Sequence, residues 1–234
     1  MRRAARTGDA VFRVYTWSSP TLSLGRNQPA RGSYDLAVAR ELGVSFVRRP
    51  TGGRALLHHR EVTYSATLPL SGEGPSQARA AYDFINSVLL VGLARLGVPA
   101  VRASETESLP PGLRPCFDVP AEHEIAVDGR KLVGSAQWRR DGALLQHGSI
   151  LVEDDQPLIA RLLTTSSGVT PKAATLAGAL GYSPSVEQVA QPLRQSLEEA
   201  TGRKVEPFAL DGDLEADVES LRAIYDDTAW TWRR

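Results

Sequence analysis

The sequence predicts one α+β domain over residues 1–234, with a mixed, largely antiparallel sheet flanked by helices. Segments of alternating apolar and polar residues lie between residues 12 and 68 and again over 123–152, as expected of half-buried strands. Asp-Gly pairs at 128–129 and 141–142 stand between such segments and favour tight hairpin turns. Stretches with apolar residues at helical spacing lie between and after these strands, which is typical of the α+β class.

The individual elements follow from the same local patterns. Apolar residues recur at helical spacing over 76–97, where Ser76 can cap the helix and Gly97 can end it. Shorter helices are expected over 34–42, 157–163, 186–201 and 214–225. Strands are expected over 12–17, 21–25, 44–49, 62–68, 123–127, 131–139 and 143–152.

Composition excludes several classes of protein. The chain has 27 basic and 27 acidic residues and no net charge, which argues against a dedicated nucleic-acid binder. The sequence contains no run of about 18 apolar residues, so it predicts no membrane span. The basic first residues are followed by no apolar stretch, so no secretory signal is predicted. The single cysteine cannot form an internal disulfide or a cysteine-based zinc site. We therefore expect a soluble, cytoplasmic protein without a metal.

The segment 48–54 (RRPTGGR) is the first candidate for chemistry. Two glycines after a strand let the backbone approach a ligand closely, and flanking arginines favour a phosphate or carboxylate. The spacing is that of neither a Walker loop nor a dinucleotide fingerprint. A tight surface turn with solvated arginines is the alternative.

Cys116 is the second candidate. It follows a proline-rich stretch, 109–115 (LPPGLRP), on what should be an exposed loop, an unusual place for a core residue. A neighbouring cation would lower its pKa and make the thiolate a competent nucleophile. A small buried hydrophobic residue is the alternative.

The segment 128–137 (DGRKLVGSAQ) is the third candidate. Lys131 opens a strand, and the small residues Gly134, Ser135 and Ala136 leave room for a ligand against the sheet. A solvated turn lysine is the alternative. The four histidines are too scattered for a metal site, and at most one of the adjacent His58 and His59 can face a site.

Taken together, these segments resemble the lipoate/octanoate transferase and ligase superfamily. The blocks that carry the resemblance stand in the same order, RRPTGG (48–53), CFDVP (116–120), GRKLVGSAQ (129–137) and LLQHGSI (144–150). The pattern looks most like the octanoyl-acyl carrier protein:protein octanoyltransferases of the cysteine-loop type. The resemblance implies a mixed sheet with flanking helices, related to biotin protein ligases and class II tRNA synthetase cores.

The resemblance also implies roles for single residues. Cys116 matches the nucleophile, and Lys131 matches the lysine that lies against the acyl carbonyl. The loop lining the acyl and carrier channel is matched by Arg49, Thr51, Gly52, Gly53 and His58. Arginines at the mouth, among them Arg48 and Arg54, would suit an acidic acyl carrier protein and its phosphopantetheine arm.

The implied donor is octanoyl-acyl carrier protein, and the implied acceptor is a lipoyl domain of the glycine cleavage H protein or a 2-oxoacid dehydrogenase subunit. No cofactor is then needed. Two departures from the family pattern stand out. About ten unrelated residues replace the strand and helix that usually precede the first strand here, and His123 stands where a tyrosine is common.

Other functions stay open at this point. An ATP-dependent lipoate–protein ligase, requiring ATP and Mg²⁺, belongs to the same superfamily, but typically carries a third glycine at the position of Arg54 and needs no cysteine. An octanoyl amidotransferase would use a similar cysteine loop, with a sequence closer to CPGS than to CFDVP. A non-catalytic binder of acyl groups or carrier proteins is a further alternative.

Overall fold

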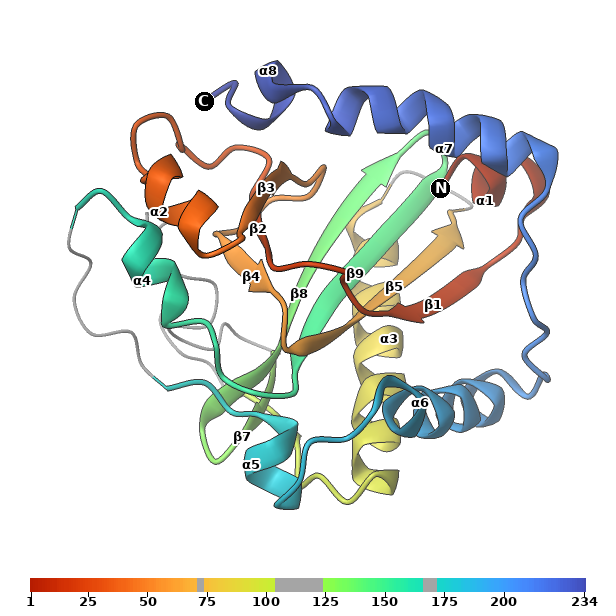
Figure 1. The fold of residues 1–234 in the computed structure, drawn as a ribbon. Coiled ribbons are helices and arrows are strands. Elements are labelled where there is room, and N and C mark those ends of the chain that lie inside the picture. Colours follow the sequence, from red (N-terminus) through yellow and green to blue (C-terminus); the bar gives the residue numbers. More distant parts are fainter. Residues whose placement is uncertain (71–73, 104–123, 166–171) are drawn as a thin grey trace.

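The computed structural model describes residues 1–70, 74–103, 124–165 and 172–234. Cys116 and His123 lie outside these ranges, so the predictions made for them stay predictions. The described chain folds into two sheets with helices around them (Figure 1). The predicted α+β class, with a largely antiparallel sheet, is confirmed.

The larger sheet has six strands in the order β1-β5-β9-β8-β7-β6, and every neighbouring pair is antiparallel. Its turns follow the prediction, because both residues of each Asp-Gly pair adopt positive φ, with 50° at Asp128 and 51° at Asp141. The strands are β1 (Val11–Tyr15), β5 (Glu61–Pro69), β6 (Val101–Arg102), β7 (Ile125–Val127), β8 (Arg130–Arg140) and β9 (Ala143–Leu151).

The smaller sheet has the order β3-β2-β4 and lies beside the larger one (Figure 1). Its strands are β2 (Thr21–Leu24), β3 (Ser45–Arg48) and β4 (Leu56–His58). Strand β2 pairs in parallel with β3 and antiparallel with β4, which makes the fold mixed. The segment 49–55 connects β3 to β4, so the predicted glycine loop is the connection between two strands of this sheet.

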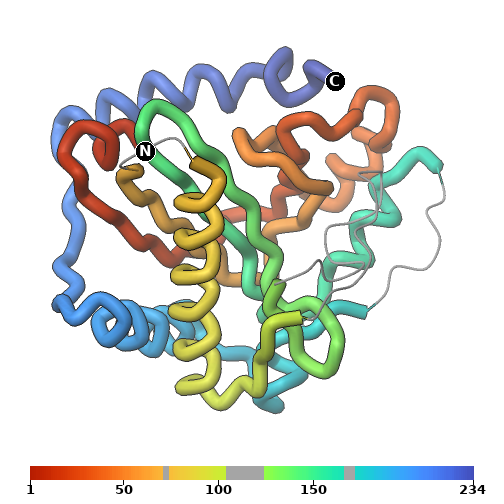
Figure 2. The backbone as a smooth tube through the Cα atoms, turned by 180° about the vertical axis from the view of Figure 1, so that it is seen from behind, coloured from red at the N-terminus to blue at the C-terminus, as the bar shows by residue number. Residues whose placement is uncertain are grey.

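The long helix α3 (Pro75–Arg95) crosses one face of the larger sheet (Figure 2). Its buried side chains, including Ile85, Leu89 and Leu93, join residues of β5, β7, β8 and β9 in the main apolar core. The predicted cap at Ser76 is wrong. The helix begins one residue earlier, with Gly74 as N-cap and Pro75 in the first turn, where a missing N–H costs nothing.

The remaining helices are α1 (Arg2–Thr7), α2 (Leu36–Glu41), α4 (Leu158–Leu162), α5 (Leu176–Leu180), α6 (Val186–Thr201), α7 (Gly212–Tyr225) and α8 (Thr228–Thr231). Four of these, α2, α4, α6 and α7, match the predicted ranges, while α1, α5 and α8 were not predicted. Among the described residues, no helix is long and apolar enough to cross a membrane.

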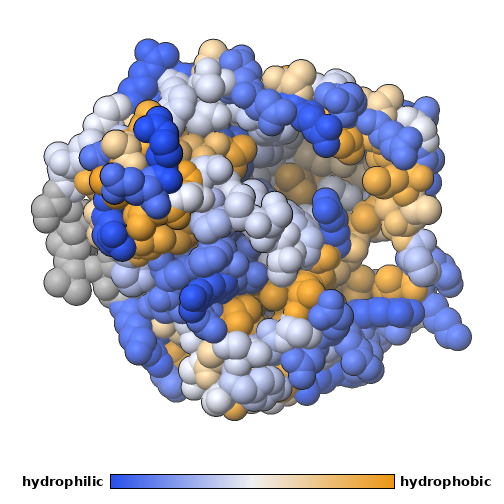
Figure 3. All heavy atoms as spheres, viewed as in Figure 1, coloured by the Kyte–Doolittle hydropathy of each residue, from blue (hydrophilic) through white to orange (hydrophobic). Residues whose placement is uncertain are grey.

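Helix α7 lies across one end of the larger sheet, next to α1 (Figure 1). Three ion pairs join α1 to α7 and its N-cap, connecting Arg2 to Asp217, Arg3 to the N-cap Asp211 and Arg6 to Asp213. No residue of α7 is fully buried, so the helix covers the sheet without entering the core. The surface is hollowed beneath it, and apolar side chains are visible in the hollow (Figure 3).

Candidate functional site

A cavity of about 470 Å³ lies between the two sheets. This volume is within the range of small-molecule sites. Six of the predicted site residues line it, namely Arg49, Gly53, His58, Gly134, Ser135 and Ala136. Residues that sequence reasoning did not select also line it, and Trp17, Thr63, His147 and Tyr225 are the most informative of them.

The part of the wall that β8 contributes is built from small residues. Gly134 and Ala136 on β8 pair with Ser149 and His147 on β9. Large side chains at these positions would fill the space, so the predicted role of the small residues as room for a ligand fits their position. The opposite wall comes from the smaller sheet and the loop after β3.

Arg49 organises that loop from within. Its guanidinium donates hydrogen bonds to the carbonyl oxygens of Ser23, Gly52 and Arg54, at 2.8, 2.8 and 2.7 Å. Only 9% of its surface is exposed. The charge is therefore held inside the loop, where it can also face an anionic or carbonyl group in the cavity.

The two glycines of the loop differ in what they require. Gly53 has a φ of +94°, and a Cβ there would lie 2.7 Å from Nη2 of Arg49. A Cβ on Gly52 would meet no atom within 4 Å. The backbone therefore demands glycine at position 53 and tolerates a side chain at position 52. Gly52, Thr51 and Arg54 are not among the described residues that line the cavity.

Thr51 is connected to the cavity by a hydrogen bond to His147, which lines it. Its hydroxyl lies 2.7 Å from Nε2 of His147, across the gap between the loop and β9. Burial, followed by the positive charge of Arg49 and by His58, lowers the pKa of the His147 imidazole to about 4. His147 is therefore neutral at pH 7 and ties the glycine loop to the larger sheet.

His58 lines the cavity and belongs to a buried polar cluster. Its ring stacks on Trp17 with centroids 4.3 Å apart, and its Nδ1 lies 3.2 Å from Oε1 of Glu61. The Glu61 carboxylate is fully buried and also accepts hydrogen bonds from the hydroxyls of Thr63 and Ser149. As predicted, the two adjacent histidines diverge, since His58 is buried and His59 is exposed.

Lys131 is buried, with 3% of its side chain exposed, and its Nζ lies 2.7 Å from Oε1 of Glu124. The interpretation as a solvated turn lysine is therefore wrong. Such a charge is retained inside a protein only beside a partner that compensates its lost hydration. Lys131 stands three residues before Gly134 on β8 and is not among the described residues that line the cavity.

The expected cluster of surface arginines around the glycine loop needs correction. Arg48 is fully buried, and its guanidinium donates to the carbonyl oxygens of Gly25, Gln28 and Thr231. Arg49 is nearly as buried, whereas Arg54 is partly exposed. Both guanidinium groups donate hydrogen bonds to carbonyl groups that tertiary folding brings together. The local sequence does not reveal these partners.

Glu124 was not selected from the sequence, although the β7–β8 hairpin brings it to Lys131. Tyr225 was not selected because α7 reaches the cavity only through tertiary folding. His147 was detectable, since it lies in the LLQHGSI block. Within the described residues, no group of three or more His, Cys, Asp or Glu side chains is arranged to hold a metal ion.

The two sheets and their helices form the α+β fold that is seen in lipoate protein ligase structures. A putative lipoate protein ligase from T. acidophilum with bound lipoic acid superposes with a TM-score of 0.81 at 20% identity, covering 100% of this chain and 91% of that one. Residues 1–198 match the model of the lipoyl protein ligase A/B catalytic domain, and the chain belongs to that family.

Several relatives share more of the sequence. Octanoyltransferase LipM of Kyrpidia tusciae is 39% identical over 239 aligned residues, covering 96% of this chain and 87% of that protein. Octanoyltransferase LipM of Symbiobacterium thermophilum is 37% identical, with the same coverage. Octanoyltransferase LipM of Staphylococcus aureus is 32% identical, covering 97% of this chain and 88% of that protein.

Proposed function

We propose that this chain transfers an octanoyl group from octanoyl-acyl carrier protein, through a thioester on Cys116, to a lysine of a lipoyl domain. The observation that carries the proposal is its similarity, over nearly the whole chain, to proteins named octanoyltransferases. The chain is an enzyme of that acyltransferase class, active in protein lipoylation. The cavity between the sheets, lined by small and aromatic residues, suits an alkyl chain.

The chemistry requires two acyl transfers. The Cys116 thiolate attacks the carbonyl carbon of the donor thioester, and the tetrahedral intermediate collapses with release of the carrier's thiolate, which takes a proton. The neutral amine of the acceptor lysine then attacks the new thioester. An amide forms, the Cys116 thiolate leaves, and the proton lost by the amine goes to solvent or to a nearby base.

Lys131 is the proposed electrostatic partner in both steps. A positive charge held at the start of β8 can stabilise the oxyanion of each tetrahedral intermediate and favour the thiolate form of cysteine. Its buried ion pair with Glu124 fixes the position of this charge at the start of β8.

No ATP, Mg²⁺ or other cofactor enters this scheme, because the donor thioester is already activated. That separates the proposal from the ligase alternative, in which free lipoate would have to be activated first. We place the reaction in the cytoplasm, with an acidic carrier protein as donor and the glycine cleavage H protein or a 2-oxoacid dehydrogenase subunit as acceptor.

The test is incubation of the purified chain with octanoyl-acyl carrier protein, without ATP, followed by mass spectrometry of the intact protein. We expect one octanoyl group on Cys116 and its transfer when a lipoyl domain is added. Cys116→Ala should acquire no octanoyl group, and Cys116→Ser should lose most activity, because an unactivated hydroxyl is a weak nucleophile. Acceptor modification only with ATP and free lipoate would support the ligase instead.

A further inference from the structure

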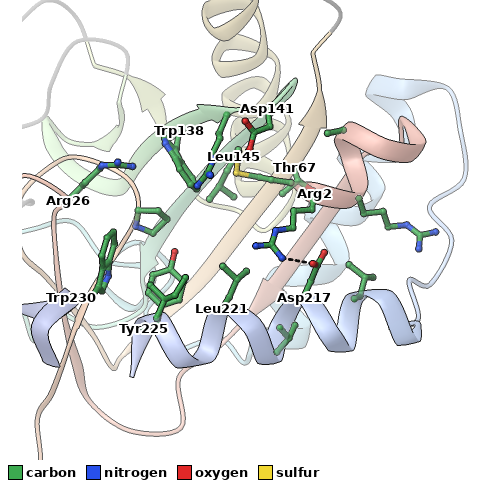
Figure 4. A pocket seen from close by; sticks show the side chains of 18 residues that line it. Arg2, Arg26, Thr67, Trp138, Asp141, Leu145, Asp217, Leu221, Tyr225 and Trp230 are labelled. Carbon is green, nitrogen blue, oxygen red and sulfur yellow. Dashed lines mark hydrogen bonds and ion pairs between the residues drawn. The ribbon is translucent and has the colours of Figure 1, made fainter. Parts of the chain in front are cut away.

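A second cavity, also about 470 Å³, borders the first beneath helix α7 (Figure 4). Pro50 and Tyr225 line both cavities and therefore stand at their boundary. Tyr225 projects from the last turn of α7 towards the sheet (Figure 4). The family model ends at residue 198, so Tyr225 comes from a part of the chain beyond it.

The two cavities follow one another along the strands of the larger sheet. On β8 the first cavity is lined by residues 134–136 and the second by Trp138 and Arg140. On β9 they are lined by residues 147–148 and by Leu145, respectively. Lys131 precedes both on β8, about 10 Å before Gly134 at the rise of an extended strand.

This order gives the acyl chain a direction. A thioester carbonyl near Lys131 places the alkyl chain along residues 134–136, so that its methyl end points towards the boundary between the cavities. The Tyr225 ring stands there, and its edge-to-face contact with Trp230, at a centroid distance of 6.0 Å, supports it from the side.

We infer that Tyr225 forms the end wall of the acyl cavity and so limits the length of the acyl chain that the enzyme accepts. This inference rests on the proposed function for the direction of the chain. The space behind the wall suits further methylene groups, because Leu145 and Leu221 line it (Figure 4), together with Ile224. Shortening Tyr225 would join the two cavities into one longer pocket.

The test compares acyl chains of 8 and 12 carbons, using the whole 234-residue chain. Tyr225→Ala opens the wall, and Tyr225→Phe keeps the ring and removes only the hydroxyl. Leu221→Ala is the matched control, because Leu221 lies one turn earlier on the same helix and lines only the second cavity. The measurements are kcat/KM with octanoyl- and dodecanoyl-acyl carrier protein, and calorimetric affinities for free octanoate and dodecanoate.

We expect Tyr225→Ala to raise the dodecanoyl-to-octanoyl ratio at least about tenfold, since a single methylene that no longer clashes changes discrimination by about that factor. Tyr225→Phe and Leu221→Ala should keep the wild-type ratio. Should Tyr225→Ala fail to fold, Tyr225→Leu shortens the side chain while keeping an apolar contact, and the same change in ratio is expected.

An unchanged ratio in folded Tyr225→Ala or Tyr225→Leu, or an equal change in Leu221→Ala, would overturn the inference. The affinities for free acids separate this result from failure of the proposed function. If the wild type transfers no octanoyl group but the affinity ratio shifts in Tyr225→Ala, the inference about Tyr225 is supported and the octanoyltransferase proposal is wrong. If transfer occurs and neither ratio shifts, only the end wall falls.

Discussion

The hydroxyl of Thr51 lies 2.7 Å from Nε2 of His147, and this hydrogen bond joins the glycine loop to the larger sheet. The imidazole is largely buried next to the guanidinium of Arg49. A proton on His147 would therefore be opposed both by lost hydration and by a neighbouring positive charge. The loop is attached to the sheet through a group that stays neutral at physiological pH.

Acid should loosen this attachment. Burial first, and then Arg49 and His58, lower the pKa of His147 from 6.5 to about 4, so the unfolded chain binds the proton more tightly than the folded one. The contribution of the neutral His147 to the free energy of unfolding is therefore fully present above about pH 6.5. It is lost as the pH falls towards 4, by up to about 3 kcal/mol. Urea unfolding at pH 7.5 and pH 4.5 measures this loss.

His147→Gln is the control for this pH dependence, because glutamine can hydrogen bond to Thr51 and does not titrate. The variant should lose less stability than the wild type between the two pH values. An equal loss of stability between the two pH values in both proteins would show that His147 is not the source of the pH dependence.

Replacement of Lys131 should impair both catalysis and stability. Lys131→Ala leaves the carboxylate of Glu124 buried without its ammonium partner, at a cost of about 3–5 kcal/mol. Loss of the charge should also reduce octanoyl transfer by on the order of 10²–10³. Lys131→Arg should not restore activity, because a planar guanidinium does not reproduce a compact ammonium. Urea unfolding and transfer rates measure the two effects separately.

A double variant separates the two roles of Lys131. Changing Lys131→Met together with Glu124→Leu removes both charges, and such apolar replacements of buried pairs are often neutral in stability. We expect a folded protein that does not transfer octanoyl groups. Wild-type transfer by this double variant would show that the pair only supports the fold.

The glycine loop offers a matched pair of substitutions. Gly53→Ala must adopt a φ of +94° and displace the Arg49 guanidinium, so it should cost about 1–3 kcal/mol and reduce transfer. Gly52→Ala meets no atom within 4 Å and should change stability by less than about 0.5 kcal/mol. Thermal unfolding and transfer assays of both variants test this contrast, and equal effects at the two positions would contradict it.

Recognition of the carrier should depend on Arg54 more than on its two buried neighbours in the RRPTGGR segment. Arg54→Glu should raise the KM for octanoyl-acyl carrier protein and leave the second transfer step unchanged, because exposed charges act mainly on encounter. Higher salt should weaken the wild-type interaction, since the Debye length is only about 8 Å at physiological ionic strength.

Arg203→Glu makes the same charge change just after α6, a helix that Figure 1 shows away from β3 and β4, and should leave this KM unchanged. Steady-state kinetics at two salt concentrations test both variants. A salt-independent KM, or an equal effect of Arg203→Glu, would exclude Arg54 as the docking charge.

Local physics explains which elements the sequence predicted correctly. The range 186–201 was predicted to the residue, because Ser185 caps the helix, Gly202 ends it in a left-handed conformation and the apolar spacing is regular. The hairpin of β8 and β9 was equally clear, since Asp141 and Gly142 favour the positive φ that its turn needs. These signals act within a few residues.

The candidate site was only partly predictable, for the same reason. A short motif indicates that Gly53 and Gly134 can make room for a ligand, but not which side chains complete the walls. Strand β4 brings His58 against Trp17, and α7 brings Tyr225 to the far end. Each of these contacts joins segments far apart in the sequence.

The sequence by itself determined the α+β class, the hairpins, the main helices and the family. Periodicity, turn residues and ordered motifs depend on residues that are close together in the sequence. Tertiary structure alone decided the state of the charges. Arg48 reads as a surface arginine, yet it is buried because carbonyl groups from residues 25, 28 and 231 converge on it. Lys131 reads as a turn lysine, yet Glu124 makes its burial possible. Whether a charge is exposed or buried depends on the partners that folding supplies.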